Sequence, residues 1–393
     1  MSTREAPLES LFTEGGPGFR MMHRLRLLHP EVQVASGRAA VTLAALSWLP
    51  LLILSASQGL LLGGAKIPFV KDIAAQARFL LAVPLLVLAD IPVGFRLREM
   101  VRQFLNSRLV QEQDRTRFEE ILIDAVAIRD SRIAEIVVVA LAYIATFLNF
   151  AQGQLQRGST WYTPDATSRL SLASYWYVLV ALPIFQFLIF RWIYRMLNWA
   201  LFLSKVSRLD LRLSAAHPDA AGGLGFLGKS LIPFGTITFA LSTVVSGAIA
   251  SRVLFAGAQL QSFALVYVAL VIITLILFAR PLLIFTPRLI RLKYQGMLKY
   301  GLLADRYTQL FEQKWVALAE GRQADESVLG TGDIQSLADL GNSFELVRKM
   351  RVFPAEPSDF VALAIPALAP VLPLLTTVMP LSEILTDLLK LIA

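Results

Sequence analysis

Seven apolar blocks, each close to 20 residues or longer, constrain this chain more than any other feature of its sequence. A helix needs about 20 mostly apolar residues to cross the hydrocarbon core of a bilayer. Within that core, only helices and closed barrels satisfy all their backbone polar groups. We therefore predict an all-α, polytopic membrane bundle with seven spans, at about 39–62, 73–95, 133–151, 172–200, 231–256, 261–286 and 360–380.

Lysine and arginine are distributed unevenly between the stretches that join these blocks. If every block crosses the membrane, 27 of the 37 Lys and Arg residues lie on the side that holds the N-terminus. Because cytoplasmic loops collect positive charge, we predict a cytoplasmic N-terminus and an external C-terminus. Alternatively, the last block is a re-entrant hairpin that returns the C-terminus to the cytoplasm.

The polar stretches divide the chain into four parts. Residues 96–132 keep a helical apolar periodicity, which predicts a helical hairpin or a bent helix that runs into the third span. Within this stretch Thr116 and Glu119 fit a capping box, which predicts a helix start. We expect a cytoplasmic tail at 1–38, a six-span bundle at 39–286 with a cytoplasmic loop at 201–230, a cytoplasmic helical region at 287–358, and a proline-rich seventh segment with an amphipathic tail at 359–393.

The titratable residues offer little catalytic chemistry. The chain has no cysteine, and its three histidines, His23, His29 and His217, lack a recognised metal-ligand spacing. The spans also contain too few acids and histidines for an intramembrane hydrolase. We therefore expect no enzyme activity, no catalytic residue, no metal and no cofactor. The net charge of +8 follows from the cytoplasmic Lys and Arg bias, so no nucleic-acid partner is predicted.

The loop between the fourth and fifth spans contains three overlapping motif matches. Residues 217–230, HPDAAGGLGFLGKS, fit the phosphate-binding P-loop, the dinucleotide fingerprint and the HPD tripeptide of J-domains. The first two motifs need a preceding strand and the third needs two soluble helices, whereas a turn and a membrane span occur here. We interpret the loop as a glycine-built turn whose aspartate accepts backbone N–H groups, with a pH-sensitive ligand or gate at the histidine as the alternative. Its singled-out residues are His217, Asp219, Gly222, Gly223 and Gly225.

Two stretches resemble a family of bacterial multi-spanning inner-membrane proteins of uncharacterised function. One is HPDAAGGLGFLG in the loop, and the other is DIQSLADLGNSFELVRKMR followed by a proline-rich apolar run. The resemblance covers the C-terminal half of the chain. It implies a multi-pass protein of the bacterial inner membrane, and it carries no activity that would assign a role to any residue.

Asp90 and five arginines lie within the predicted spans, where a charge costs about 2.5–3.5 kcal/mol at the bilayer centre. We expect the arginines to snorkel, extending their charged heads to the nearer interface. Asp90 is too short to snorkel far, so we predict an ion pair with Arg280, Arg191 or Arg195, with Arg280 preferred. We interpret that pair as a structural clamp, and a proton or cation site is the alternative. The five arginines are Arg78, Arg191, Arg195, Arg252 and Arg280.

The last apolar block places its prolines on one helical face. Each proline removes an N–H and frees the carbonyl four residues earlier, so this face must meet protein or water. One hypothesis is that the segment lines an aqueous path in an oligomer, and the alternative is a kinked helix packed within the bundle. The residues predicted to line such a path are Pro366, Pro370, Pro373, Thr376 and Thr377.

Together these patterns predict an oligomeric channel or transporter for an ion or small solute. The alternative is a membrane receptor or scaffold whose cytoplasmic helices dock a partner. The expected partners are the lipid bilayer and further copies of the chain in a homo-oligomer.

Overall fold

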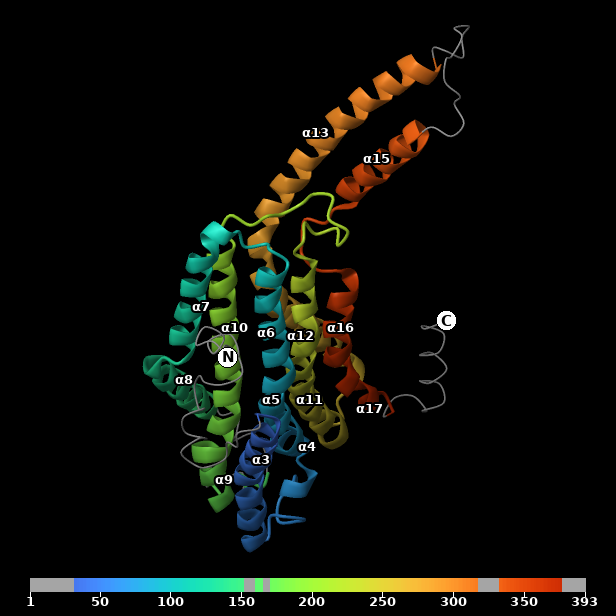
Figure 1. Ribbon diagram of the computed structural model, residues 1–393. Helices are drawn as coiled ribbons and strands as arrows, with labels where there is room; N and C mark the ends of the chain where they lie inside the picture. The colour runs from blue at the N-terminus through green and yellow to red at the C-terminus, as the bar shows by residue number, and fades with distance from the viewer. Residues whose placement is uncertain (1–31, 152–159, 165–169, 317–331, 377–393) are drawn as a thin grey trace.

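The computed structural model describes residues 32–151, 160–164, 170–316 and 332–376, which form helices joined by turns (Figure 1). These residues contain isolated β-bridges but no strand. Seven helices in the described ranges are long and apolar enough to cross a membrane, which confirms the predicted all-α bundle and indicates an integral membrane protein. They are Ser36–Ser57, Ile73–Asn106, Arg132–Phe150, Leu172–Val206, Gly225–Ala256, Leu260–Val316 and Pro357–Leu375.

Spans two and four are each interrupted by a π-helical turn. Span one is the single helix α3 (Val32–Ser57), and span three is α8 (Arg132–Ala151). Span two consists of α4 (Ile73–Gln76), a π-helical turn (Ala77–Ala82), α5 (Val83–Leu88) and α6 (Asp90–Asn106). Span four consists of α9 (Leu172–Trp176), a second π-helical turn (Tyr177–Ala181) and α10 (Leu182–Val206).

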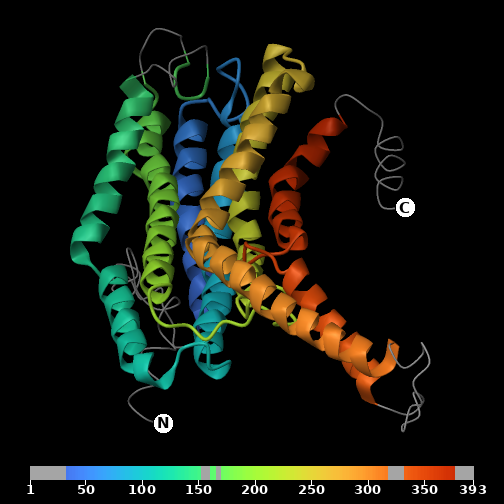
Figure 2. The same cartoon turned by 90° about the horizontal axis from the view of Figure 1, so that it is seen from above.

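The C-terminal half adds three spans and a projecting helix pair. Span five is α11 (Leu231–Ala256), and span six is α12 (Ala264–Ala279). A 3-10 segment (Arg280–Phe285) links α12 to α13 (Thr286–Phe311), against which α15 (Gly332–Lys349) packs. The α13–α15 pair projects away from the bundle in both views (Figures 1 and 2). Span seven consists of α16 (Pro357–Leu368), a 3-10 turn (Ala369–Val371) and α17 (Leu372–Leu375).

The stretch at 96–132 combines the hairpin and the bent helix. α6 continues to Asn106, and after a turn α7 (Arg115–Arg129) runs back along α10 and bends into α8. A helix does start here, but the capping box at Thr116 is wrong, because α7 begins at Arg115 with Asp114 as its N-cap and Thr116 lies inside the helix. The Asp114 carboxylate instead accepts the backbone N–H of Asp210 at 2.8 Å, which joins this turn to the end of span four.

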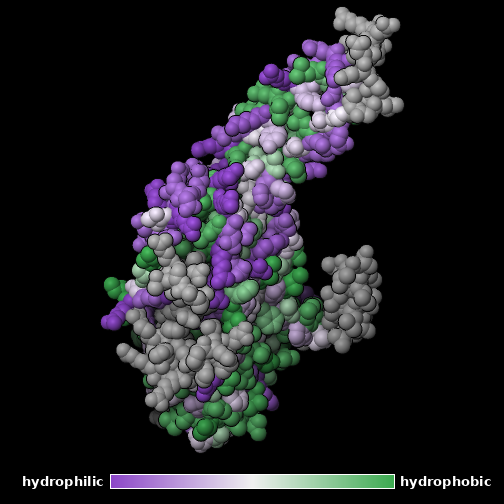
Figure 3. All heavy atoms as spheres, in the orientation of Figure 1, coloured by the Kyte–Doolittle hydropathy of each residue, from purple (hydrophilic) through white to green (hydrophobic). Residues whose placement is uncertain are grey.

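Polar and apolar side chains are segregated along the molecule. Hydrophilic residues gather toward the end that carries α13 and α15, and hydrophobic residues cover much of the opposite end (Figure 3). This segregation agrees with the predicted location of 287–358 outside the bilayer. The cytoplasmic assignment of that end remains a prediction from the charge count.

Candidate functional site

The loop at 217–230 forms a glycine-built turn around one carboxylate. Gly222 and Gly223 have φ angles of +69° and +95°, which L side chains rarely adopt. The Asp219 carboxylate accepts hydrogen bonds of 2.8, 3.1 and 2.8 Å from the backbone N–H groups of Ala221, Gly223 and Gly225. The predicted role of Asp219 as an acceptor of backbone N–H groups is therefore confirmed.

The same loop is fixed to the first turn of α16 and to the segment that precedes it. Lys229 Nζ lies 2.9 Å from a carboxylate oxygen of Asp359 and 3.2 Å from one of Glu356. Arg351 donates to the carbonyl oxygen of Asp219 at 2.8 Å, so the two stretches that carry the family resemblance contact each other. Because the lysine of the P-loop match is ion-paired and no strand precedes the glycines in the described residues, these contacts favour a structural loop.

We expect Asp219→Ala to destabilise the protein at neutral pH by about 1–3 kcal/mol, because three backbone donors lose their charged acceptor. Burial acts to raise the pKa of Asp219, but the N–H groups of Ala221, Gly225 and Gly223 outweigh it and lower that pKa. The stabilisation is therefore present above the ordinary carboxyl pKa of about 3.9 and is lost as pH falls through the lower folded value. Thermal unfolding in detergent should show the difference from wild type shrinking at low pH. A constant difference would contradict this account, and Asp339→Ala on α15 is the control.

Close packing at Gly228 predicts a second defect in this region. A Cβ on Gly228 would lie 2.6 Å from Cα and 2.9 Å from Cβ of Ala355, and backbone atoms cannot move away cheaply. Overpacking of this kind costs about 1–3 kcal/mol, so Gly228→Ala should lower the midpoint of thermal unfolding. Gly341→Ala on α15 is the matched control, because a Cβ there meets no atom within 4 Å and alanine favours helices. Equal midpoints for the two variants would contradict the predicted clash.

Asp90 forms an ion-paired cluster between spans two and four. Its carboxylate lies 2.6 Å from Nη2 of Arg191 and also pairs with Nη1 of Arg195. Both were among the predicted candidate partners, so an ion pair at Asp90 is confirmed. The preference for Arg280 is wrong, because Arg280 lies at the end of span six in the wall of a separate groove. Arg191 and Arg195 are one helical turn apart on α10, so both can reach the same carboxylate.

Arg191 is buried rather than extended to an interface, which corrects the expected snorkelling at this position. Its residue exposure is 3%, and its Nε and Nη1 atoms are buried without a hydrogen-bond partner. Arg195 stacks over Trp192, with 4.5 Å between the guanidinium carbon and the ring centroid. The cluster therefore holds two guanidinium groups around one carboxylate inside the bundle.

The proline-rich segment packs against span five through part of its proline face. Pro366 lies so close to α11 that a Cβ on Gly235 would be 3.0 Å from its Cγ. Ser242 of α11 donates a hydrogen bond to the carbonyl oxygen of Ala367. Further along, Pro373 and Thr376 are exposed, and Thr377 lies outside the described residues. Pro366 therefore contacts the bundle, and a pore at the exposed end remains a prediction that requires a second copy.

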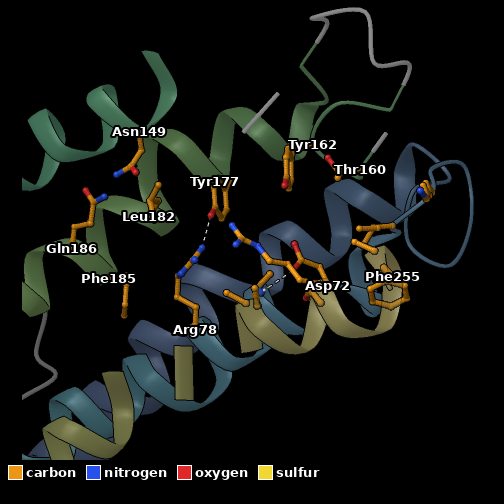
Figure 4. A pocket seen from close by; sticks show the side chains of 18 residues that line it. Asp72, Arg78, Asn149, Thr160, Tyr162, Tyr177, Leu182, Phe185, Gln186 and Phe255 are labelled. Atoms are coloured by element: carbon orange, nitrogen blue, oxygen red, sulfur yellow. Dashed lines mark hydrogen bonds between the residues drawn. The ribbon is translucent and has the colours of Figure 1, made fainter. Parts of the chain in front are cut away.

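A polar concavity lies at the end of the bundle away from α13 (Figure 1), and Figure 4 shows its walls. It has a volume of about 580 Å³ and lies between spans two, three, four and five, beside the loop at 160–164. We refer to it as the cationic cavity. Its polar and aromatic walls consist of Lys66, Asp72, Arg78, Asn149, Thr160, Tyr162, Tyr177, Phe185, Gln186, Ser251, Arg252 and Phe255.

The two π-helical turns meet at this cavity. Each turn ends two residues before a proline, Pro84 in span two and Pro183 in span four. A proline cannot donate to the carbonyl four residues earlier and clashes with it, and a wider turn accommodates this defect. The carbonyl that Pro183 leaves free is that of Leu179, and it accepts a hydrogen bond from the Tyr143 hydroxyl at 3.1 Å. Single π-helical turns within longer helices often mark functional sites.

Arg78, from the first π-helical turn, projects into the cavity toward Tyr177 of the second (Figure 4). Its Nη1 donates a hydrogen bond to the Tyr177 hydroxyl. The guanidinium carbon lies 6.0 Å from the ring centroids of Phe79 and Tyr177 and 5.6 Å from that of Phe185. The Nε of Arg78 is buried without a hydrogen-bond partner, and no acid in the described residues forms an ion pair with this arginine.

The single acid in the cavity wall is already engaged. The Asp72 carboxylate accepts from Trp161 Nε1 at 2.8 Å and from the backbone N–H of Ala75 at 3.1 Å. Burial, reinforced by the charge of Asp72, raises the pKa of Tyr162 to about 12, so its hydroxyl stays protonated near neutral pH. Lys66, Arg78 and Arg252 thus outnumber one acid in the lining, which favours a negatively charged ligand.

Sequence reasoning did not identify this cavity, because Arg78 and Arg252 were expected to snorkel to an interface. The overlooked signal is a shared spacing. Arg78 lies six residues before Pro84, and Tyr177 lies six residues before Pro183. Two spans with a polar residue at the same distance from a proline indicate two local helix defects, although the spacing alone does not place them side by side.

Comparisons of the chain with protein-family models, with curated proteins and with solved structures found no match. The family resemblance of the loop therefore remains a prediction. The seven spans indicate an integral membrane protein, and the cationic cavity is assigned from its geometry.

Proposed function

We propose that the protein transports a small organic anion, which binds in the cationic cavity beside Arg78. The observation that carries this proposal is the guanidinium of Arg78, which has no ion-pair partner in the described residues and lies among aromatic rings with a buried Nε that lacks a hydrogen-bond partner. An arginine offers a planar fork of donors that matches a carboxylate. A carboxylate on the ligand would accept hydrogen bonds from the Arg78 N–H groups that do not donate to Tyr177.

The cavity walls also indicate the body of the ligand. Phe185, Phe255 and Tyr177 line it with aromatic surface, and Asn149 and Gln186 add amide groups. A volume of about 580 Å³ lies within the range of about 300–1,000 Å³ that is usual for small-molecule sites. We therefore expect a small carboxylate with an apolar or aromatic body, such as benzoate, to bind more tightly than acetate.

A transporter fits the bundle better than an open channel. Asp90 follows Arg78 by 12 residues along span two, a distance of about 18 Å at the helical rise. The ion-paired cluster at Asp90 is not part of the cavity lining, so the cavity does not continue past it. On the predicted orientation the cavity opens externally and the cluster lies toward the cytoplasm, as expected for a site that alternates between two openings. The cavity forms within one chain, and the expected homo-oligomer is not needed to complete it.

Liposomes that contain the purified protein provide the test. We expect saturable uptake of radiolabelled benzoate that unlabelled benzoate inhibits, with little inhibition by neutral benzamide or by the trimethylanilinium cation. Binding can be measured separately by titration calorimetry in detergent. If neither uptake nor binding of benzoate or related aromatic carboxylates is detected, the proposal fails.

The receptor alternative is favoured by one observation, the α13–α15 pair that projects from the end opposite the cavity. A ligand-binding cavity at one end and an exposed helix pair at the other also suit a sensor. Binding of benzoate without uptake would support a receptor and contradict a transporter. Both measurements use the full chain, because a variant that lacks 287–349 is informative only if it folds.

A further inference from the structure

A second concavity, of about 590 Å³, lies between spans four and six and differs in character from the cationic cavity. Its walls are almost entirely apolar, and we refer to it as the α10–α12 groove. Leu197, Leu201 and Ile273 in its walls are each at least half exposed, so the groove opens outward from the bundle. Arg280 is the one charged residue in its lining.

The groove is polar at one end only. α10 and α12 both run toward the end of the bundle that carries α13, so residues with higher numbers lie nearer that end. Ile193 and Ile273 therefore lie at the deep, apolar end, and Ser204 and Arg280 lie at the opposite end. Ile193 and Ser204 are 11 residues apart, or about 16 Å along a helix, which is close to half of a hydrocarbon core about 30 Å thick.

Arg280 has no counter-ion among the residues that the structure describes. It is exposed, and no acid in the described part of the chain forms an ion pair with it. A guanidinium at the mouth of a leaflet-deep apolar groove complements a phosphate attached to a hydrocarbon chain. Basic positions between membrane helices on the cytoplasmic side commonly bind anionic headgroups.

We propose that the α10–α12 groove binds an anionic phospholipid, with one acyl chain along Leu197 and Ile273 and the phosphate at Arg280. The shape of the groove accommodates the chain, and the arginine selects the headgroup charge. This site is separate from the cationic cavity and stands whether or not that cavity binds benzoate.

Native mass spectrometry of the full-length protein, titrated with phosphatidylglycerol or phosphatidylcholine, tests the proposal. Wild type should form adducts with phosphatidylglycerol in preference to phosphatidylcholine. Arg280→Gln should lower the apparent affinity for phosphatidylglycerol by about fivefold, since one arginine near an anionic lipid contributes about 1 kcal/mol. The matched control, Arg291→Gln, removes an exposed charge on α13 outside the groove and should leave the affinity unchanged.

A second variant separates the acyl-chain site from general charge attraction. Ala200→Trp fills the groove without changing charge, and we expect it to remove the preferential phosphatidylglycerol adduct. Equal binding of the two lipids by wild type, or unchanged phosphatidylglycerol binding by both Arg280→Gln and Ala200→Trp, would overturn the proposal.

A cysteine in the groove tests for a second copy of the chain in place of the lipid. Because the chain has no cysteine, any disulfide formed by Leu197→Cys must link two copies through this position. A disulfide-linked dimer in liposomes would show that the groove contacts a second copy and would overturn the proposal.

Discussion

Arg78→Gln is expected to weaken benzoate binding to the cationic cavity by about 100-fold. A hydrogen bond to a charged group contributes about 1.5–3 kcal/mol, and 100-fold in affinity corresponds to about 2.8 kcal/mol. The loss should be near the upper part of that range, because the guanidinium lies among aromatic rings and pairs with no carboxylate in the described part of the chain. Titration calorimetry in detergent measures the binding, and uptake into liposomes should fall in parallel.

Two further substitutions make the result at Arg78 specific. Arg78→Lys keeps the charge but loses the planar fork, so we expect an intermediate affinity. Arg252→Gln, at an exposed position in the same cavity, should cost only a few-fold because solvent screens its charge. Full affinity in a folded Arg78→Gln protein, shown by an unchanged elution volume and unfolding midpoint, would exclude Arg78 as the anion site.

Asp90→Asn is expected to cause the largest loss of stability. Removing one member of a buried ion pair typically costs about 3–5 kcal/mol, because the remaining charge stays buried without compensation. Here the carboxylate pairs with both Arg191 and Arg195, and the Arg191 side chain is only 4% exposed, with its Nε and Nη1 buried without a hydrogen-bond partner. Thermal unfolding in detergent should show a much lower midpoint and a reduced yield of folded protein.

The control for Asp90 is a solvent-exposed ion pair that joins Asp124 of α7 to Lys205 of α10, the helix that also carries Arg191 and Arg195. Lys205 and Asp124 lie 2.7 Å apart with side-chain exposures of 42% and 60%. Exposed pairs contribute about 0–1 kcal/mol, so Asp124→Asn should change the midpoint little. If Asp90→Asn has the same midpoint of thermal unfolding as the wild type yet alters benzoate uptake, the cluster is a functional ion site and the structural-clamp interpretation is wrong.

The fold could be predicted largely from the sequence because span formation is a local property. The fifth span was predicted at 231–256 and is the helix Leu231–Ala256. The limits of other spans shifted where a helix continues beyond its apolar block, as span two does to Asn106 and span six does into α13. Hydropathy marks where a helix enters the bilayer, but the hydrogen-bonded helix ends where a proline, a glycine or a cap stops it.

The candidate site could be predicted only in part. Sequence reasoning identified Asp90 as a residue that needs a partner, and the structure supplied Arg191 and Arg195 instead of Arg280. Sequence reasoning also assigned Arg78 to an interface, whereas the structure places it beside Tyr177. The sequence named Arg191 and Arg195 among the candidate partners of Asp90 without ranking them first, and it suggested no neighbour for Arg78. In both cases the partners lie about 100 residues away along the chain, so sequence spacing could not select them.

By itself, the sequence determined that this is a seven-span helical membrane protein with a glycine-built loop, because bilayer thickness and backbone hydrogen bonding constrain each segment separately. Only the tertiary structure decided which side chains meet. A helix in lipid is apolar on all sides, so no polar stripe reveals which face turns inward. Contacts such as that of Gly247 with Ala77, where a Cβ would lie 2.8 Å from its neighbour, fix the rotation of each span. The two π-helical turns face each other through the contact of the Phe79 and Tyr177 rings and the hydrogen bond from Arg78 to Tyr177, and together with spans three and five they line the cationic cavity.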